Sequence, residues 1–144
     1  MKTKVVTNNR LQTQKLGQLL ATELRGGEII SLLGDLGGGK TTFTQGLAAG
    51  LKIKEKIISP TFVIFKKYPA KHPKIKYLYH FDLYRPHDLQ EILDLGFEET
   101  ISRPENITII EWADKVQKII PPANNLKIKF LFLGKNSREL TFFT

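Results

Sequence analysis

The sequence predicts an α/β fold, with a central mixed β-sheet flanked by helices in a single domain that covers residues 1–144. Two observations predict it. Apolar runs with strand character alternate with segments of helical periodicity, which is typical of a sheet covered by helices. Hydrophobic residues make up 41% of the chain and charged residues 25%, a balance that suits a globular protein with one ordinary core.

The first third of the chain predicts two strands, each followed by a helix. A short strand is expected at residues 4–7 and a helix at residues 11–24, where leucine recurs at helical spacing. The apolar run at residues 27–33 predicts a buried strand, and residues 40–51 predict a second helix with Gly50 near its end. The leucines expected on one face of the first helix are Leu16, Leu19, Leu20 and Leu24.

The rest of the chain predicts two hairpins, with two helices and a buried strand between them. Strand-like runs at residues 61–68 and 75–84 indicate an antiparallel hairpin. Gly96 and the pair Pro121-Pro122 are expected to end the two helices that follow. The remaining elements are helices at residues 88–95 and 113–120, a buried strand at 107–112, and a C-terminal hairpin formed by 126–133 and 139–143.

The stretch GDLGGGKTT, residues 34–42, lies between a predicted strand and a predicted helix and matches the phosphate-binding pattern G-x-x-x-x-G-K-[ST]. Its glycines allow the backbone to bring successive N–H groups around an anion. Lys40 is expected to reach the β- and γ-phosphates and the Thr41 hydroxyl to bind Mg²⁺, while the helix N-terminus adds a positive dipole. The pattern predicts a nucleoside triphosphate site in a P-loop NTPase-like domain. The expected nucleotide-binding residues are Asp35, Gly37, Gly38, Gly39, Lys40, Thr41 and Thr42.

A P-loop enzyme also needs a carboxylate at the end of a neighbouring strand, and two apolar runs end in one. Residues 77–81 lead to Asp82, and residues 107–110 lead to Glu111. Either carboxylate could bind Mg²⁺ through water together with Thr41, because Mg²⁺ prefers oxygen ligands and keeps several waters. The other could polarise the attacking water. Each could instead cap the next helix or pair with a surface lysine, so the residues alone leave both roles open.

The chain is basic, with a formal net charge of +8, and five of its lysines fall between residues 66 and 76. Lys52, Lys54 and Lys56 form a second cluster. The clusters predict either a surface for nucleic acid or an acidic partner, or a solvated loop whose lysines protect a sheet edge. The second interpretation is favoured, because the aromatic residues of 66–76 do not form a stacking platform.

The sequence also predicts where the protein works. It has no cysteine, so neither disulfides nor a cysteine metal site are expected. No apolar run approaches the roughly 18 residues that span a bilayer, and residues 1–15 lack the apolar core of a signal peptide. We therefore expect a cytoplasmic protein with no membrane contact.

Five motifs follow one another in the order seen in the bacterial TsaE (YjeE) family, which the chain resembles over roughly residues 10–140. The resemblance implies a small ATPase needed to form N6-threonylcarbamoyladenosine (t6A) at position 37 of tRNAs. It also implies slow hydrolysis of ATP with Mg²⁺ and action through the TsaB–TsaD heterodimer, so that tRNA is reached indirectly through that complex. The motifs are GDLGGGKTT at 34–42, SPTF at 59–62, HFDLYR at 80–85, LDLGFEE at 93–99 and IIEWADK at 109–115.

Matching these motifs residue by residue assigns roles that the spacing left open. By the resemblance, Glu111 would be the Mg²⁺ ligand beside Thr41, and Asp82 would be the catalytic carboxylate. Thr61, in SPTF, would belong to a switch-like segment that senses the γ-phosphate. Trp112 would lie near the site, although a tryptophan there could equally be a core aromatic residue.

Other positions carry weaker expectations. The family's N-terminal segment suggests Arg10 and Thr13 for the adenine, and Gly38 replaces an alanine that is usual in the family, which the same loop accommodates. His80 could relay protons, but a hydrogen-bonded structural role is favoured. Arg85 could neutralise phosphate charge or pair with a nearby glutamate.

Two other functions remain as alternatives. A small-molecule kinase would close an arginine-bearing lid over the phosphates, and the five arginines of this chain are scattered singly. A non-catalytic, nucleotide-gated RNA-binding module is suggested by the charge. Tight binding of tRNA by the free protein, with no ATP turnover even beside partners, would favour that module.

Overall fold

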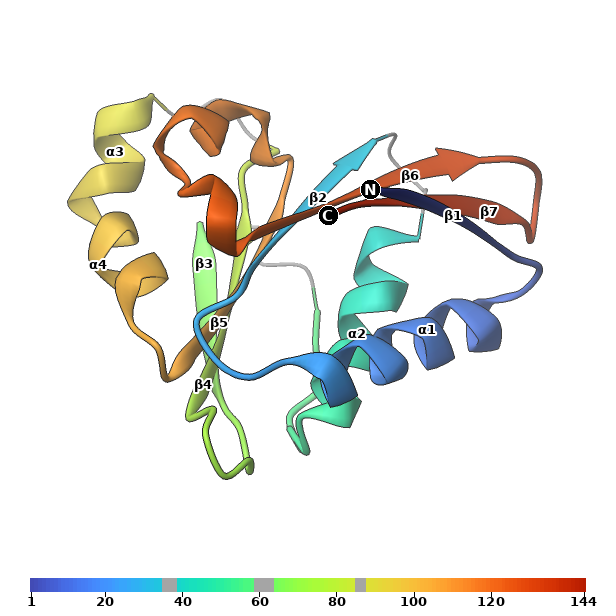
Figure 1. The fold of residues 1–144 in the computed structure, drawn as a ribbon, viewed down its shortest axis with the longest axis horizontal. Coiled ribbons are helices and arrows are strands. Elements are labelled where there is room, and N and C mark those ends of the chain that lie inside the picture. The colour runs from blue at the N-terminus through green and yellow to red at the C-terminus, as the bar shows by residue number, and fades with distance from the viewer. Residues whose placement is uncertain (35–38, 59–63, 85–87) are drawn as a thin grey trace.

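The computed structural model of the protein describes residues 1–34, 39–58, 64–84 and 88–144. Within these ranges seven strands form one mixed sheet in the order β1-β7-β6-β2-β5-β4-β3 (Figure 1). This confirms the predicted α/β fold with a mixed sheet flanked by helices. The strands are β1 (Lys2–Thr7), β2 (Ile29–Gly34), β3 (Phe65–Pro69), β4 (Tyr77–Asp82), β5 (Asn106–Glu111), β6 (Asn125–Phe132) and β7 (Arg138–Phe143).

The centre of the sheet is parallel and its edges are antiparallel. Strand β2 runs parallel to both β5 and β6, and β4 runs parallel to β5. The β3–β4 and β6–β7 pairs are antiparallel hairpins, as predicted, and β1 joins the sheet antiparallel to β7. Because β2, β4 and β5 are parallel, their carboxyl ends lie at one edge of the sheet, where ligands bind in open α/β sheets.

Helices cover both faces of the sheet, and each face has its own core (Figure 1). On one face, helices α1 (Arg10–Glu23) and α2 (Lys40–Gly50) pack over residues such as Leu32 and Ile109. On the other face, α3 (Leu89–Asp94) and α4 (Phe97–Ser102) pack over Phe81 and Ile110. Two 3₁₀ helices, η1 (Ala113–Ile119) and η2 (Pro122–Asn124), lead from β5 into β6.

The buried face of α1 agrees only in part with the leucine stripe expected from the sequence. Leu24 is buried and Leu16 and Leu20 pack against the core, but Leu19 is 64% exposed. The buried residues within the helix are Thr13, Gly17 and Ala21. The reason is close contact with α2. A Cβ on Gly17 would lie 2.3 Å from the carbonyl oxygen of Phe43 in α2, so small residues are required where the two helices meet.

The segment after β4 also departs from expectation. Gly96 ends α3 as predicted, but its left-handed conformation (φ 79°) starts a second short helix, α4, that the sequence did not predict. The helix expected at 113–120 is the 3₁₀ helix η1, and β5 ends at Glu111, one residue before Trp112. No helix in the described ranges is long and apolar enough to cross a membrane.

Candidate nucleotide-binding site

Three strand ends meet at the edge of the sheet where the glycine-rich loop begins. β2 ends at Gly34, β4 at Asp82 and β5 at Glu111. Glu111 is paired in register with Asp82 on one side and with Leu32 on the other. The two predicted carboxylates therefore lie on neighbouring strands, and β5, which carries Glu111, lies beside the strand that leads into the loop.

Both carboxylates lie on the face of the sheet that α2 covers. Side chains alternate between faces along a strand. Leu78 and Ile109 belong to the core beneath α1 and α2. Asp82 lies four positions after Leu78 on β4, and Glu111 lies two positions after Ile109 on β5. Both intervals are even, so the two carboxylates point to the same face as these core residues. The structure thus brings together, on one face, the two acids and the helix that begins with Lys40.

Lys40 is 4% exposed and is held across the start of the site. Its Nζ donates a hydrogen bond to the carbonyl oxygen of Gly34 at 2.8 Å and lies 3.8 Å from the centroid of the Trp112 ring. A lysine ammonium over a tryptophan face is attracted by the ring quadrupole. The cation therefore lies between the first residue of the motif and the residue that follows Glu111.

Glu111 is buried and is fixed by His80. Its Oε2 lies 2.6 Å from His80 Nε2, and the two residues are 3% and 0% exposed. With Glu111 as the carboxylate, the Nε2–H group of the imidazole donates this bond. His80 Nδ1 is buried and has no hydrogen-bond partner among the described residues, which favours the tautomer with its proton on Nε2. The sequence favoured a hydrogen-bonded structural role for His80, and in the structure its partner is the Glu111 carboxylate.

Asp82 lies in a more open position than Glu111. It is half-buried, and its Oδ1 accepts a hydrogen bond from the backbone N–H of Tyr84 at 3.0 Å. The Asp82 N–H donates to the carbonyl oxygen of Ile64, which lies two residues after the SPTF motif in the sequence. A half-buried carboxylate with access to solvent suits contact with water better than the enclosed Glu111 does.

Trp112 adopts a backbone conformation that bulky residues rarely take, with φ 59° and ψ 49°. Such a conformation costs about 1–3 kcal/mol and persists only where the surroundings impose it. Its ring contacts the Lys40 ammonium and packs against Tyr84, with centroids 5.0 Å apart. The strained turn directly after Glu111 therefore places the Trp112 ring against Lys40, and the ring also packs against the core beneath α3 and α4.

Two further side chains border the loop at Gly39, which has φ 95°. The position that a Cβ would occupy there is 3.5 Å from Arg138 Cγ and 3.6 Å from the methyl group of Thr13. Thr13 was suggested by resemblance, but Arg138 was not. Arg10 instead bonds Gln45 of α2.

Arg138 is a candidate that sequence reasoning missed. Its Nη1 donates to the carbonyl oxygens of Gly134 and Ser137, and its guanidinium lies 4.6 Å from the Phe132 ring centroid. Its Nε is buried with no hydrogen-bond partner in the described part of the chain. Only the pairing of β7 beside β6 brings this arginine to the loop, so no local motif could have indicated it.

Several expected site residues fall outside the described residues. These are Asp35, Gly37, Gly38, Thr61 and Arg85. Of the other predicted nucleotide-binding residues, Thr41 and Thr42 lie in the first turn of α2. The dipole of α2 and the N–H groups of its first turn favour an anion there.

Known proteins resemble this chain over nearly its whole length. The family described as threonylcarbamoyl adenosine biosynthesis protein TsaE matches residues 7–140. The chain belongs to the TsaE family. Curated members named tRNA threonylcarbamoyladenosine biosynthesis protein TsaE include one from Bacillus subtilis and one from Nostoc. Each is 38% identical to this chain, over 94% and 95% of it and over 82% and 83% of the relative, respectively.

A solved structure is similar to this chain in its fold as well as in its sequence. The crystal structure of Bacillus subtilis YdiB matches 99% of this chain and 84% of the YdiB chain, with a TM-score of 0.72 and 33% sequence identity. The TsaE family is P-loop NTPase-like, and this supports nucleotide binding and ATPase activity in general for the present member.

Proposed function

We propose that this TsaE-family protein binds ATP with Mg²⁺, hydrolyses it slowly, and is required for threonylcarbamoyl modification of adenosine 37 in tRNA. In this proposal residues 1–144 act as one cytoplasmic ATPase domain beside a TsaB–TsaD heterodimer, which contacts the tRNA. The observation that carries the proposal is the convergence of Lys40, Asp82 and Glu111 at one sheet edge. The names of the relatives support the role in t6A biosynthesis.

The donor atoms at this edge suit Mg²⁺. Thr41 offers a hydroxyl oxygen at the start of α2 and Glu111 a carboxylate, and Mg²⁺ prefers such oxygen ligands while keeping several waters. These two residues would hold it, with His80 fixing the orientation of the Glu111 carboxylate. When bound, Mg²⁺ neutralises charge on the β- and γ-phosphate oxygens.

The other residues divide the remaining work. Lys40 would exchange its bond to the Gly34 carbonyl for the phosphate oxygens, which are the stronger, charge-assisted partners. The first turn of α2 would donate backbone N–H groups to the same phosphates. Asp82 would orient the attacking water, and Thr61 would sense the γ-phosphate.

The Lys40→Ala variant tests the nucleotide site. It removes the side-chain cation that the motif directs at the phosphates, so we expect ATP·Mg²⁺ affinity to fall by at least about 10-fold, because a charged hydrogen bond contributes roughly 1.5–3 kcal/mol. Calorimetric titration of wild type and variant measures it. A folded variant that binds ATP as tightly as wild type would contradict the site. In the same series, t6A formation on tRNA by a TsaB–TsaD mixture should require the wild-type protein.

A further inference from the structure

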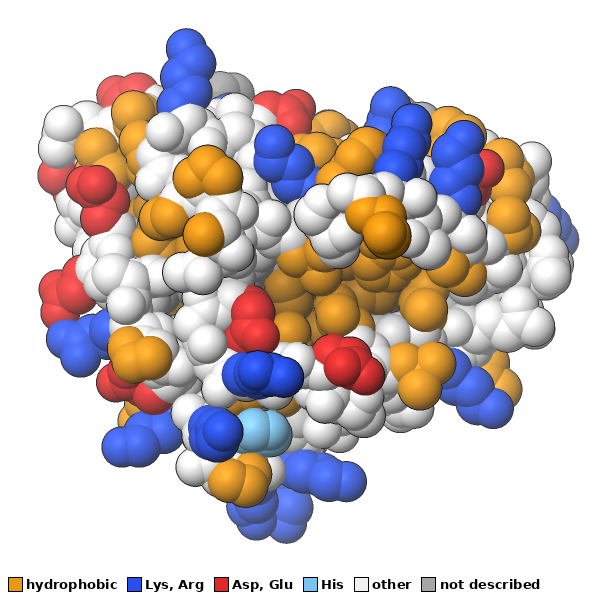
Figure 2. All heavy atoms as spheres, in the orientation of Figure 1, with side chains coloured by type: hydrophobic (Ala, Val, Ile, Leu, Met, Phe, Trp, Pro, Cys, Tyr) orange, Lys and Arg blue, Asp and Glu red, His pale blue; other side chains and the backbone are white. Residues whose placement is uncertain are grey.

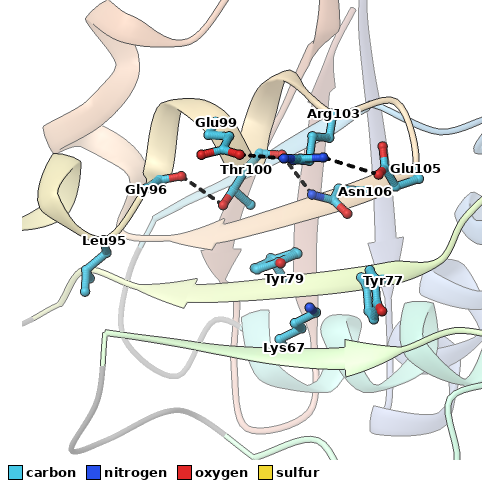
Figure 3. A pocket seen from close by; sticks show the side chains of 10 residues that line it. All are labelled: Lys67, Tyr77, Tyr79, Leu95, Gly96, Glu99, Thr100, Arg103, Glu105 and Asn106. Atoms are coloured by element: carbon cyan, nitrogen blue, oxygen red, sulfur yellow. Dashed lines mark hydrogen bonds and ion pairs between the residues drawn. The ribbon is translucent and has the colours of Figure 1, made fainter.

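A hollow lies on the opposite face of the sheet from the nucleotide site. It has a volume of about 360 Å³, and its floor is formed by Lys67 of β3 with Tyr77 and Tyr79 of β4 (Figure 3). Its other side is formed by α4 and the segment that enters β5, including Arg103 (Figure 3). We name it the tyrosine groove. Its size falls within the roughly 300–1,000 Å³ of ligand-binding sites.

The groove exists because α3 and α4 leave part of this face of the sheet uncovered. Phe81 is completely buried beneath α3 and α4, whereas Tyr77 and Tyr79, on the same face of β4, are only half-buried. α4 ends at Ser102, and β3 is the edge strand. Two aromatic rings at alternate positions of β4 therefore remain accessible on an uncovered part of the sheet.

A cation already lies against these rings. Lys67 is the cross-strand partner of Tyr79, and its Nζ is 3.9 Å from the Tyr77 ring centroid and 5.7 Å from that of Tyr79. Lys67 is exposed, so it can move from the rings to a phosphate at little cost. The ring faces are then available for stacking.

The upper side of the groove offers both donors and acceptors. Arg103 pairs with Glu99 and, at 3.8 Å, with Glu105, and its side chain is 52% exposed. The hydrogen bond with Glu99 raises the pKa of Arg103, so it remains a cation. Figure 3 shows the two rings between Lys67 and this row of charged groups. Because the charges in the groove balance, it suits the polar edge of a base better than a phosphate.

Unbalanced positive charge lies next to the groove, at the turn of the β3–β4 hairpin. Lys71, Lys74 and Lys76 are exposed there, and Figure 2 shows lysine and arginine side chains gathered along the lower edge of the molecule. Residues 65–81 contain five lysines and no acidic residue. This surface is complementary to a phosphate backbone that continues from the groove.

We infer that the tyrosine groove binds an unpaired base of single-stranded RNA, while the hairpin lysines hold the adjoining phosphates. Proteins that read single-stranded RNA stack splayed bases on aromatic side chains of an open sheet face. A base inside a duplex cannot reach these rings. The inference rests on the proposed function only in choosing RNA over DNA, and it adds a direct RNA contact to the indirect one proposed above.

Fluorescence anisotropy with a labelled single-stranded RNA of ten nucleotides, in the absence of ATP and partners, tests it. At 50 mM salt we expect a dissociation constant on the order of 1–100 µM, and weaker binding of a duplex of the same length. Tyr77→Leu should weaken binding by roughly 5- to 100-fold, the range of a lost base stack, whereas Tyr77→Phe should stay close to wild type. Unchanged ATP affinity and thermal unfolding would show that both variants are folded.

A charge-matched pair of variants separates the phosphate contacts from net charge. Lys71→Gln/Lys74→Gln should lower the dependence of log K on log salt by about 1.4, at roughly 0.7 per lost phosphate contact on a single strand. Lys2→Gln/Lys4→Gln removes the same charge from β1, at the opposite edge of the sheet, and should leave the slope unchanged.

Photochemical crosslinking of the wild-type protein to the same RNA needs no variant and should attach it at Tyr77 or Tyr79. Crosslinks found only elsewhere would overturn the inference. Equal RNA binding by Tyr77→Leu and wild type would also overturn it. If poly-glutamate displaces the RNA and the Tyr77→Leu substitution does not change RNA binding, the surface binds an acidic protein partner instead. Since the assay contains no ATP, a failure to bind RNA would not contradict the proposed ATP site. A failure to bind ATP would likewise not contradict the RNA-binding groove.

Discussion

At the scale of single residues, the hydrogen bond between His80 and Glu111 fixes the orientation of a buried carboxylate. His80→Leu would remove the hydrogen-bond donor of that carboxylate, which costs about 1–3 kcal/mol for a buried polar group. We expect a lower free energy of unfolding and a higher Mg²⁺ concentration for half-maximal ATP binding. His80→Gln keeps an N–H donor and should recover much of the Mg²⁺ dependence. Equal behaviour of the two variants in Mg²⁺ titrations would show that the bond does not position Glu111.

The two carboxylates should be separable by what each substitution damages. Glu111→Gln should weaken Mg²⁺-dependent ATP binding and turnover together, because the metal acts in both the ground state and the transition state. Asp82→Asn should keep ATP affinity within a few-fold and lower turnover by roughly 10²–10⁴. Asp82 is half-buried and Glu111 is buried, which agrees with this division.

Titrations of ATP and Mg²⁺ on each variant, with turnover measured beside the partners, decide between these roles. If Asp82→Asn loses its Mg²⁺ dependence while Glu111→Gln binds normally and fails only in turnover, the two roles are exchanged.

The residues that local patterns could indicate were those with a fixed relation to a strand or helix end. Lys40 and the two carboxylates are of this kind. The positioning role of His80 and the place of Arg138 beside Gly39 depend instead on which strands are neighbours. Hydrophobic periodicity says that a strand is buried, but not which strand lies beside it.

At the scale of elements, the contact between α1 and α2 depends on glycine. A Cβ on Gly46 would lie 1.9 Å from the carbonyl oxygen of Gln14 in α1. Alanine is favoured over glycine in a helix by about 1 kcal/mol, but forcing an extra methyl group into a packed contact costs about 1–3 kcal/mol or more. Because the added Cβ would meet backbone atoms of Gln14, the cost lies at the upper end of that range, and we expect Gly46→Ala to lower the free energy of unfolding by about 2 kcal/mol, measured by urea denaturation.

Gly134→Ala is the matched control. A Cβ at Gly134 would meet nothing within 4 Å, so its stability should change by no more than about 0.5 kcal/mol. A Gly46→Ala variant as stable as this control would contradict the close packing of α1 on α2.

The same contact explains why the expected face of α1 was only partly right, while the helix itself was predicted. Leucine spacing indicates a helix, but α2 approaches so closely that the buried stripe must consist of small residues such as Gly17 and Ala21. α4 was missed because a glycine that ends one helix was taken to begin a loop. Gly96 takes up its left-handed conformation between α3 and α4, and Phe97 then buries its ring against Phe81, a contact that local propensity does not contain.

At the scale of the whole molecule, β4 separates two surfaces. His80 and Asp82 point to the face of the P-loop, and Tyr77 and Tyr79 point to the tyrosine groove on the other face. Nucleotide and RNA would thus lie on opposite sides of one strand, with no shared residue among those described. Each surface can therefore be altered without touching the other, and the variants above depend on that separation.

The distribution of arginines predicts a slow ATPase. Among the described residues, Arg10 bonds Gln45, Arg103 pairs with Glu99 and Glu105, and Arg25 precedes β2 at the end of the sheet away from the loop. Arg138 borders Gly39 but gives its Nη1 to carbonyl oxygens of its own hairpin. The described arginines thus do little to neutralise charge that develops on the transferred phosphoryl group, and a well-placed arginine is worth roughly 10³–10⁵ in turnover in related chemistry.

We therefore expect turnover well below one per second for the free protein and at least about a tenfold rise when the TsaB–TsaD heterodimer is added, since partner contact can order a switch segment around the γ-phosphate. Steady-state phosphate release with and without the heterodimer measures it, and Asp82→Asn serves as the control that should remain slow in both. Turnover of several per second without partners would contradict the prediction and favour a kinase-like enzyme. A partner that raised ATP affinity but not turnover would instead mean that binding, and not hydrolysis, controls assembly.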